Sequence, residues 1–96
     1  MRDQIQEVVE LGFKPYIFID SDLLSVSSIS VELREVVKNA RLLSVPVVYT
    51  KEIEFLNRAR KAYVFRYGYL PDMTEAYIKR KGGKVVSGNL KVSLTT

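Results

Sequence analysis

The chain has 96 residues, 15 Lys and Arg against 11 Asp and Glu, and neither cysteine nor histidine. Without cysteine it forms no disulfide or thiolate metal site, and without histidine it lacks the most common general base and metal ligand in proteins. No apolar stretch approaches the roughly 20 residues that span a bilayer, and the length suits one compact unit. We therefore expect a single domain over residues 1–96, located in the cytoplasm and making no membrane contact.

The first half of the sequence contains two helical patterns, each followed by a short apolar run. Residues 3–11 have the spacing of an amphipathic helix, which Gly12 ends. Residues 16–19 form a continuous apolar run, which is typical of a strand covered on both faces. A serine-rich break precedes a second helix, for which Ser30 is the predicted N-cap. A second buried strand is predicted at residues 45–49.

The second half continues this alternation of helix and strand. Thr50 is predicted to cap a third helix, and residues 62–70 are predicted to contain a strand. Asp72 begins a fourth helix in a pattern that resembles a capping box, and a short strand follows that helix. Gly88-Asn89 suits a two-residue turn and is compatible with a C-terminal β-hairpin. This order predicts a single three-layer α/β/α sandwich with a mostly parallel, Rossmann-like sheet.

Positive charge is concentrated in the second half of the sequence. Residues 1–50 carry five Lys or Arg against seven Asp or Glu, whereas residues 51–96 carry ten against four. An anionic partner is therefore expected to dock on the second half. The cluster Lys79-Arg80-Lys81 with Lys84 is interpreted as the end of a helix, where the helix dipole favours cations and the charges aid solubility.

Residues 58–69 combine cations with aromatic rings. Four rings occupy alternate positions from Tyr63 to Tyr69, so on a strand they face the same side. Basic side chains attract phosphates regardless of base sequence, and exposed rings stack on unpaired bases. The alternative is that the rings belong to the core and the charges to its rim. The predicted nucleic-acid-binding residues are Arg58, Arg60, Lys61, Arg66, Tyr67 and Tyr69.

Two carboxylates, Asp20 and Asp22, follow the first predicted strand. Ligands of open α/β sheets bind at that edge, and paired carboxylates there suit a divalent ion for phosphodiester chemistry. The local sequence Asp20-Ser21-Asp22 resembles the first acidic motif of the PIN and NYN nucleases, which implies catalytic and metal-binding roles for Asp20 and Asp22. We prefer the alternative, a turn in which these side chains accept backbone N–H groups, because the next acids, Glu52 and Glu54, lie on a helix and face opposite ways.

The remaining patterns indicate no cofactor. Gly82-Gly83 follows a helix instead of opening one, so it does not have the arrangement of a phosphate-binding loop. A serine nucleophile would have no histidine to activate it. We therefore favour a protein that is not an enzyme.

The segment from Val45 to Ala59, with a Val-Pro strand followed by a lysine-containing turn, resembles the kink-turn-binding ribosomal proteins of archaea and eukaryotes. The resemblance extends over residues 1–62 and implies RNA binding. In this alignment the RNA-reading Asn-Glu pair of the family falls on Asp3-Gln4, and its helix lysine falls on Glu7. Asn57 stands at the position of the family's helix glycine.

The sequence supports three functions, of which nucleic-acid binding is the preferred one. The first is non-catalytic binding of RNA or another nucleic acid through residues 58–69. The second is a divalent-metal-dependent nuclease of PIN or NYN type that uses Asp20 and Asp22. The third is a structural homo-oligomer whose interface is the aromatic row.

Overall fold

The computed structural model describes residues 2–88, which form four helices, four strands and two short 3-10 helices, η1 (Ser21–Ser25) and η2 (Thr50–Glu52). The helices are α1 (Arg2–Glu10), α2 (Ser27–Leu42), α3 (Glu54–Arg58) and α4 (Asp72–Arg80). The strands are β1 (Lys14–Ile19), β2 (Val47–Tyr49), β3 (Ala62–Tyr67) and β4 (Lys84–Ser87). Helix and strand alternate as the sequence predicts, and none of the described helices has the length and apolar character needed to cross a membrane.

Within residues 2–88 the strands form one sheet in the order β2-β1-β3-β4, and all neighbouring strands are parallel. Strand β1 is central, because Ile17 pairs with Val47 on one side and with Phe65 on the other. Parallel neighbours require crossover connections, and the helices supply them. The predicted single α/β domain with a mostly parallel sheet is therefore confirmed.

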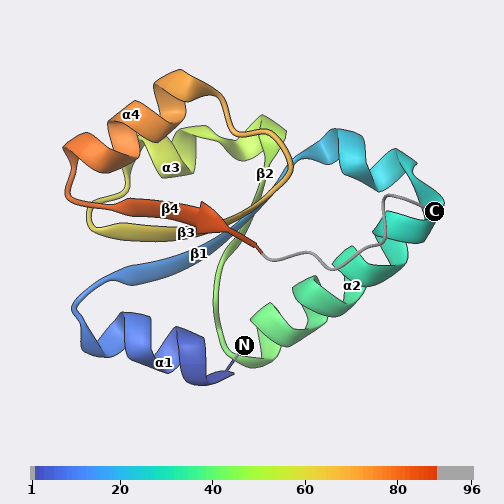
Figure 1. Cartoon of the computed structure of the whole chain (residues 1–96), viewed down its shortest axis with the longest axis horizontal. Helices are drawn as coiled ribbons and strands as arrows, with labels where there is room; N and C mark the ends of the chain where they lie inside the picture. The colour runs from blue at the N-terminus through green and yellow to red at the C-terminus, as the bar shows by residue number, and fades with distance from the viewer. Residues whose placement is uncertain (1, 89–96) are drawn as a thin grey trace.

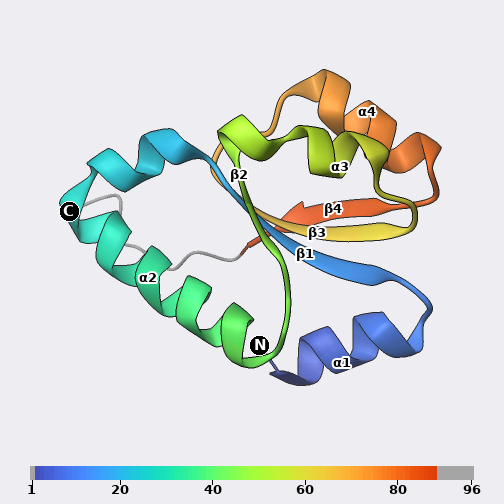
Figure 2. The same ribbon diagram turned by 180° about the vertical axis from the view of Figure 1, so that it is seen from behind.

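Helices cover both faces of the sheet. Helices α1 and α2 lie on one side, and α3 and α4 lie on the other (Figure 1), as Figure 2 shows from behind. Ile17 and Ile19 pack in the α1–α2 layer, whereas Phe18 packs in the α3–α4 layer. All three are fully buried, and burial of each such side chain stabilises a fold by about 1.5–3 kcal/mol. A strand between two helical layers needs apolar residues facing both ways, which explains the uninterrupted apolar run.

Two residues predicted to cap helices have other roles. Helix α2 begins at Ser27, three residues before Ser30, and among the described residues Val26 precedes it without a side-chain cap. The Ser30 hydroxyl instead donates to the Ser27 carbonyl at 2.9 Å. Thr50 opens η2, and its Oγ1 accepts the Ser21 N–H at 2.9 Å. The Thr50 side chain therefore ties the turn after β1 to the turn after β2.

The alternating aromatic row of β3 faces the core under α1 and α2. Phe65 and Tyr67 are each 5% exposed, and the Tyr63 ring packs against Phe13 and Phe65 at centroid distances of 5.5 and 5.2 Å. Tyr69 lies beyond the strand and is 65% exposed. The interpretation of the row as an exposed stacking surface is therefore wrong, because three of its rings are packed inside. The same packing leaves little of the row for an interface between copies.

The predicted C-terminal hairpin lies largely outside the described residues, since the description ends at Gly88. Gly88 itself packs against the Tyr67 ring, because a Cβ at this position would lie 2.5 Å from ring carbon atoms. The Gly88 N–H also donates to the Arg66 carbonyl at 2.7 Å. The absence of a side chain at Gly88 thus allows the backbone after β4 to cover the Tyr67 ring.

We predict that Tyr67 makes stability sensitive to alkaline pH. Burial raises the pKa of the Tyr67 hydroxyl above its usual value of 10.0. In the unfolded chain this hydroxyl ionises near pH 10, so its contribution to stability is complete below that pH and is lost as the pH rises further. The free energy of unfolding should fall less between pH 9 and 11 in Tyr67→Phe than in the natural chain.

Urea denaturation at each pH measures this difference. One titrating group changes the slope of the free energy of unfolding against pH by at most about 1.4 kcal/mol per pH unit. Tyr69→Phe is the matched control, because its ring is exposed, and it should keep the natural pH dependence. Identical curves for the natural chain and Tyr67→Phe would show that the buried hydroxyl makes no such contribution.

Candidate nucleic-acid interface

The amino ends of the parallel strands lie along one edge of the sheet. Each of the four described helices ends just before one of these strands, so the helix C-termini reach the same edge. The last turn of a helix favours cations because its carbonyl groups carry partial negative charge. Six cations near the starts of β1, β3 and β4 form no ion pair within the described residues, and we refer to them together as the basic edge: Lys14, Arg60, Lys61, Arg80, Lys81 and Lys84.

Backbone hydrogen bonds hold three members of the basic edge side by side. The Lys14 N–H donates to the Lys61 carbonyl at 2.8 Å, and the Lys61 N–H donates to the Lys81 carbonyl at 3.0 Å. Lys61 has a positive φ of 54°, an uncommon conformation outside glycine that reverses the chain into β3. Positions far apart in sequence are therefore fixed next to one another by the sheet.

Four side chains of the basic edge lie close to one of two rings, Phe13 or Tyr77. The ammonium groups of Lys61 and Lys84 lie 5.3 and 5.7 Å from the centroid of the Phe13 ring. The Arg80 guanidinium lies 5.2 Å from the Tyr77 ring centroid. These distances are within the range of cation–π attraction, which holds a cation over a ring face.

Lys81 has a structural role within this group. Its ammonium donates a hydrogen bond to the Asn57 backbone carbonyl and lies 5.9 Å from the Tyr77 ring centroid. It thereby joins the end of α4 to α3, whereas the other five cations of the basic edge are exposed.

Acidic side chains do not neutralise the basic edge. Within the described residues there are two ion pairs, Arg58 with Glu54 at 3.6 Å and Lys79 with Glu75 at 3.1 Å. Neither pair includes a member of the basic edge. Glu10 ends the helix that leads to β1, and in this part of the chain it forms no ion pair with these cations. The positive charge of the edge is therefore open to an anionic partner.

The residues predicted from segment 58–69 are divided between opposite edges of the sheet. Arg60 and Lys61 belong to the basic edge, and Arg58 lies close by but is paired with Glu54. Arg66, Tyr67 and Tyr69 lie at the other end of β3, because a strand advances about 3.3 Å per residue and six residues cover about 20 Å. The segment therefore does not act as one surface.

Tyr67 is also removed from the predicted set by burial, since a ring that is 5% exposed offers no face to a base. In its place the fold adds Lys14, Arg80 and Lys84, of which the last two were interpreted from the sequence as part of a helix end that aids solubility. The signal that identifies them is their position at the starts of strands and the ends of helices in a parallel α/β pattern. Such positions meet at one edge once the strands pair.

The opposite edge is organised by the carboxylate of Asp20. Its Oδ1 accepts the Asp22 N–H at 3.0 Å, and its Oδ2 accepts the Tyr69 N–H at 3.1 Å. The Asp20 N–H donates to the Tyr67 carbonyl at 2.8 Å. Asp20 thus joins the turn after β1 to the turn after β3, as the preferred interpretation of a backbone-capping turn predicts.

This joint occupies the place where ligands commonly bind in open α/β sheets. The connection from β1 leads to β2 on one side of it, and the connection from β2 leads to β3 on the other side. Such a reversal of strand order usually leaves a crevice at the carboxyl ends of the strands. Here Gly68, with φ of 95°, brings the two turns together, because a Cβ on it would lie 2.5 Å from the Asp20 Cβ. The crevice is therefore filled by the protein's own backbone.

A nuclease centre receives no geometric support from these residues. Both oxygens of Asp20 already accept backbone hydrogen bonds, and Asp22 is exposed on η1. Within residues 2–88 no group of three or more Asp or Glu side chains is arranged to hold a metal ion. The Asp20 side chain therefore serves the turn in this structure, whereas Asp22 contributes its backbone groups.

We predict that Asp20→Asn lowers the free energy of unfolding by about 1–2 kcal/mol, because the amide offers a donor where a backbone N–H requires an acceptor. Asp22→Asn is the matched control, since its side chain is exposed, and it should change stability by less than about 0.5 kcal/mol. Urea denaturation at neutral pH measures both. Equal effects of the two substitutions would contradict a joining role for Asp20.

Comparison with known proteins identifies no relative of this chain. No family model, no curated protein and no solved structure matches the chain. The resemblances to the kink-turn-binding proteins and to the PIN and NYN nucleases therefore stay predictions from sequence.

Proposed function

We propose that this chain is a non-catalytic protein that binds RNA or another nucleic acid through phosphate contacts along the basic edge. One observation carries the proposal: six cations from separate segments meet at one edge, and in the described residues none of them is paired with a carboxylate. Phosphodiester chains present closely spaced negative charges and release counterions when cations neutralise them.

The arrangement favours contact with the backbone over reading of bases. The rings nearest to the cations, Phe13 and Tyr77, are half-buried and have cations over their faces. A ring covered in this way does not offer a platform for base stacking. RNA and DNA single strands of the same length should therefore bind with similar affinity.

We predict that removing three cations of the basic edge weakens binding and reduces its dependence on salt. For single strands the slope of log affinity against log salt is about −0.7 per phosphate contact, so loss of three contacts makes the slope smaller by about 2. The variant is Lys14→Gln with Arg80→Gln and Lys84→Gln. Fluorescence anisotropy of a labelled 20-nucleotide RNA at four salt concentrations measures the slope.

The matched control removes the same amount of charge elsewhere: Arg34→Gln with Lys51→Gln and Arg66→Gln. Arg66 belongs to the set predicted from the sequence but lies at the opposite end of β3 from the basic edge. We expect this control to keep the natural slope within about 1. An equal loss in both variants would mean that net charge alone attracts RNA, and absence of binding at low salt would remove the proposal. Thermal melting of each variant verifies that the fold is retained.

A further inference from the structure

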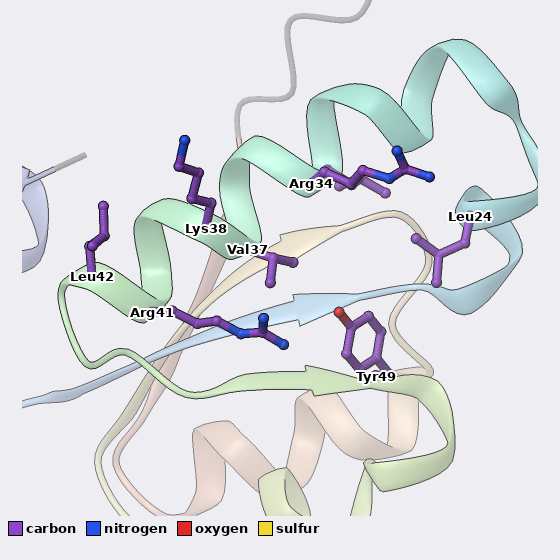
Figure 3. Close-up of a pocket in the computed structure, with 8 residues that line it drawn as sticks. Leu24, Arg34, Val37, Lys38, Arg41, Leu42 and Tyr49 are labelled. Atoms are coloured by element: carbon purple, nitrogen blue, oxygen red, sulfur yellow. The ribbon is translucent and has the colours of Figure 1, made fainter.

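A groove runs between helix α2 and the edge strand β2, away from the basic edge residues on β3 and β4 (Figure 3). The part of the groove under α2, which we refer to as the main cavity because it contains both arginines, has a volume of about 460 Å³, which is within the usual range for small-ligand sites. Two neighbouring hollows share Tyr49 with it, so the cavity continues along the strand. Its lining includes Leu24, Leu33, Arg34, Val37, Arg41 and Tyr49.

The groove has an apolar floor and a positive rim. Leu33 and Val37 pack toward the core, and Leu24 is 44% exposed at one end. Figure 3 shows the Arg34 and Arg41 side chains extending along the groove, whereas Lys38, which also lines the cavity, points away from the sheet. Among the residues that line the main cavity there is no Asp or Glu. An occupant therefore needs an apolar body and a negative charge.

The position of that charge is given by Arg41 and Tyr49. Both residues line the main cavity and also the hollow next to the start of β2, where the Glu52 carboxylate is held by the Tyr49 N–H. Figure 3 shows the Tyr49 hydroxyl directed toward α2, on the side from which Arg41 extends. A guanidinium and a phenol hydroxyl both donate hydrogen bonds, and a guanidinium matches the two oxygens of a carboxylate.

Two other kinds of occupant fit the groove less well. An added peptide strand needs free backbone groups on β2, but the Tyr49 N–H already donates to Glu52 Oε1 at 3.2 Å, and β2 has three residues. A second copy related by twofold symmetry would bring the arginines of both copies close together, which is unfavourable. A small ligand meets neither difficulty.

We propose that this groove binds a small amphipathic carboxylate, with its head group on Arg41 and Tyr49 and its apolar chain over Val37 and Leu24. The site is separate from the proposed nucleic-acid interface and does not depend on it. In a partly apolar groove the charge-assisted hydrogen bonds of one guanidinium contribute more than they do on an open surface.

The experiment uses octanoate as the probe and octanol as its uncharged analogue. Methyl resonances of Leu24, Leu33 and Val37 are followed by NMR as each probe is added to the full chain. We expect octanoate to shift these resonances and to bind at least tenfold more tightly than octanol. A guanidinium also pairs with two phosphate oxygens, so octyl phosphate is added in the same way, and binding as tight as that of octanoate would show that the site takes anionic head groups in general.

Arg41→Gln should weaken octanoate binding about tenfold and leave octanol binding unchanged. Arg58→Gln is the matched control, because it also removes one exposed arginine from the last turn of a helix but lines neither the main cavity nor the neighbouring hollows. Arg41→Lys keeps the charge and loses the forked geometry, so it should bind with intermediate affinity. Arg41 lies in the last turn of α2, where a cation stabilises the helix. Thermal melting of each variant therefore verifies that the fold is retained.

Three results would overturn the proposal. The first is that octanoate shifts no methyl resonance in the groove of the folded natural chain. The second is that octanol binds as tightly as octanoate, since the carboxylate charge would then have no role in binding. The third is an equal loss of affinity in Arg41→Gln and Arg58→Gln, which would indicate attraction to the net charge of the protein instead of binding in the groove.

Discussion

Parallel pairing on both sides of β1 is the constraint on which the rest of this structure depends. Ile17 and Ile19 fill one core layer and Phe18 fills the other, so β1 is fixed between two helical layers. Since β2 and β3 both run parallel to it, every connection must cross back over the sheet. All described helices consequently end at the edge where the strands begin.

This constraint gives the two edges of the sheet different chemistry. Helix ends attract cations, and strand starts add Lys14 and Lys84, so the amino edge becomes positive. At the carboxyl edge, Asp20 uses both of its oxygens to join two turns, and Gly68 allows these turns to touch. The place between the carboxyl ends of β1 and β3, where open α/β sheets often hold a ligand, is thus occupied by the protein itself.

The two surfaces proposed here to bind ligands differ in how their charge acts. The cations of the basic edge are mostly exposed, so each attracts an anion weakly and is screened by salt. Binding there requires many contacts at once, which a phosphodiester chain provides. In the groove beside β2, the arginines lie next to apolar side chains, so one ion pair with a matched head group is expected to have a larger effect there.

Much of the fold follows from local sequence pattern, whereas the sites do not. The apolar run at residues 16–19, the glycine at position 12 and the alternation of helix and strand predict a buried parallel sheet, and the structure has one. Helix starts were less predictable: Ser30 has the chemistry of a cap, but α2 begins three residues earlier and the hydroxyl bonds within its first turn. Packing of the helix against the sheet outweighs the preference of one side chain.

By itself the sequence determined the architecture, the absence of cysteine and histidine chemistry, and the excess of positive charge in the second half. Only the tertiary structure decided where that charge lies, because charge counted along the chain ignores which edge or face a residue occupies. Arg34, Lys38 and Arg41 recur at intervals of four and three residues and share one helix face, although their half of the chain is acidic overall. Likewise, Arg60 and Arg66 are close in sequence, but an extended strand places them at opposite edges of the sheet.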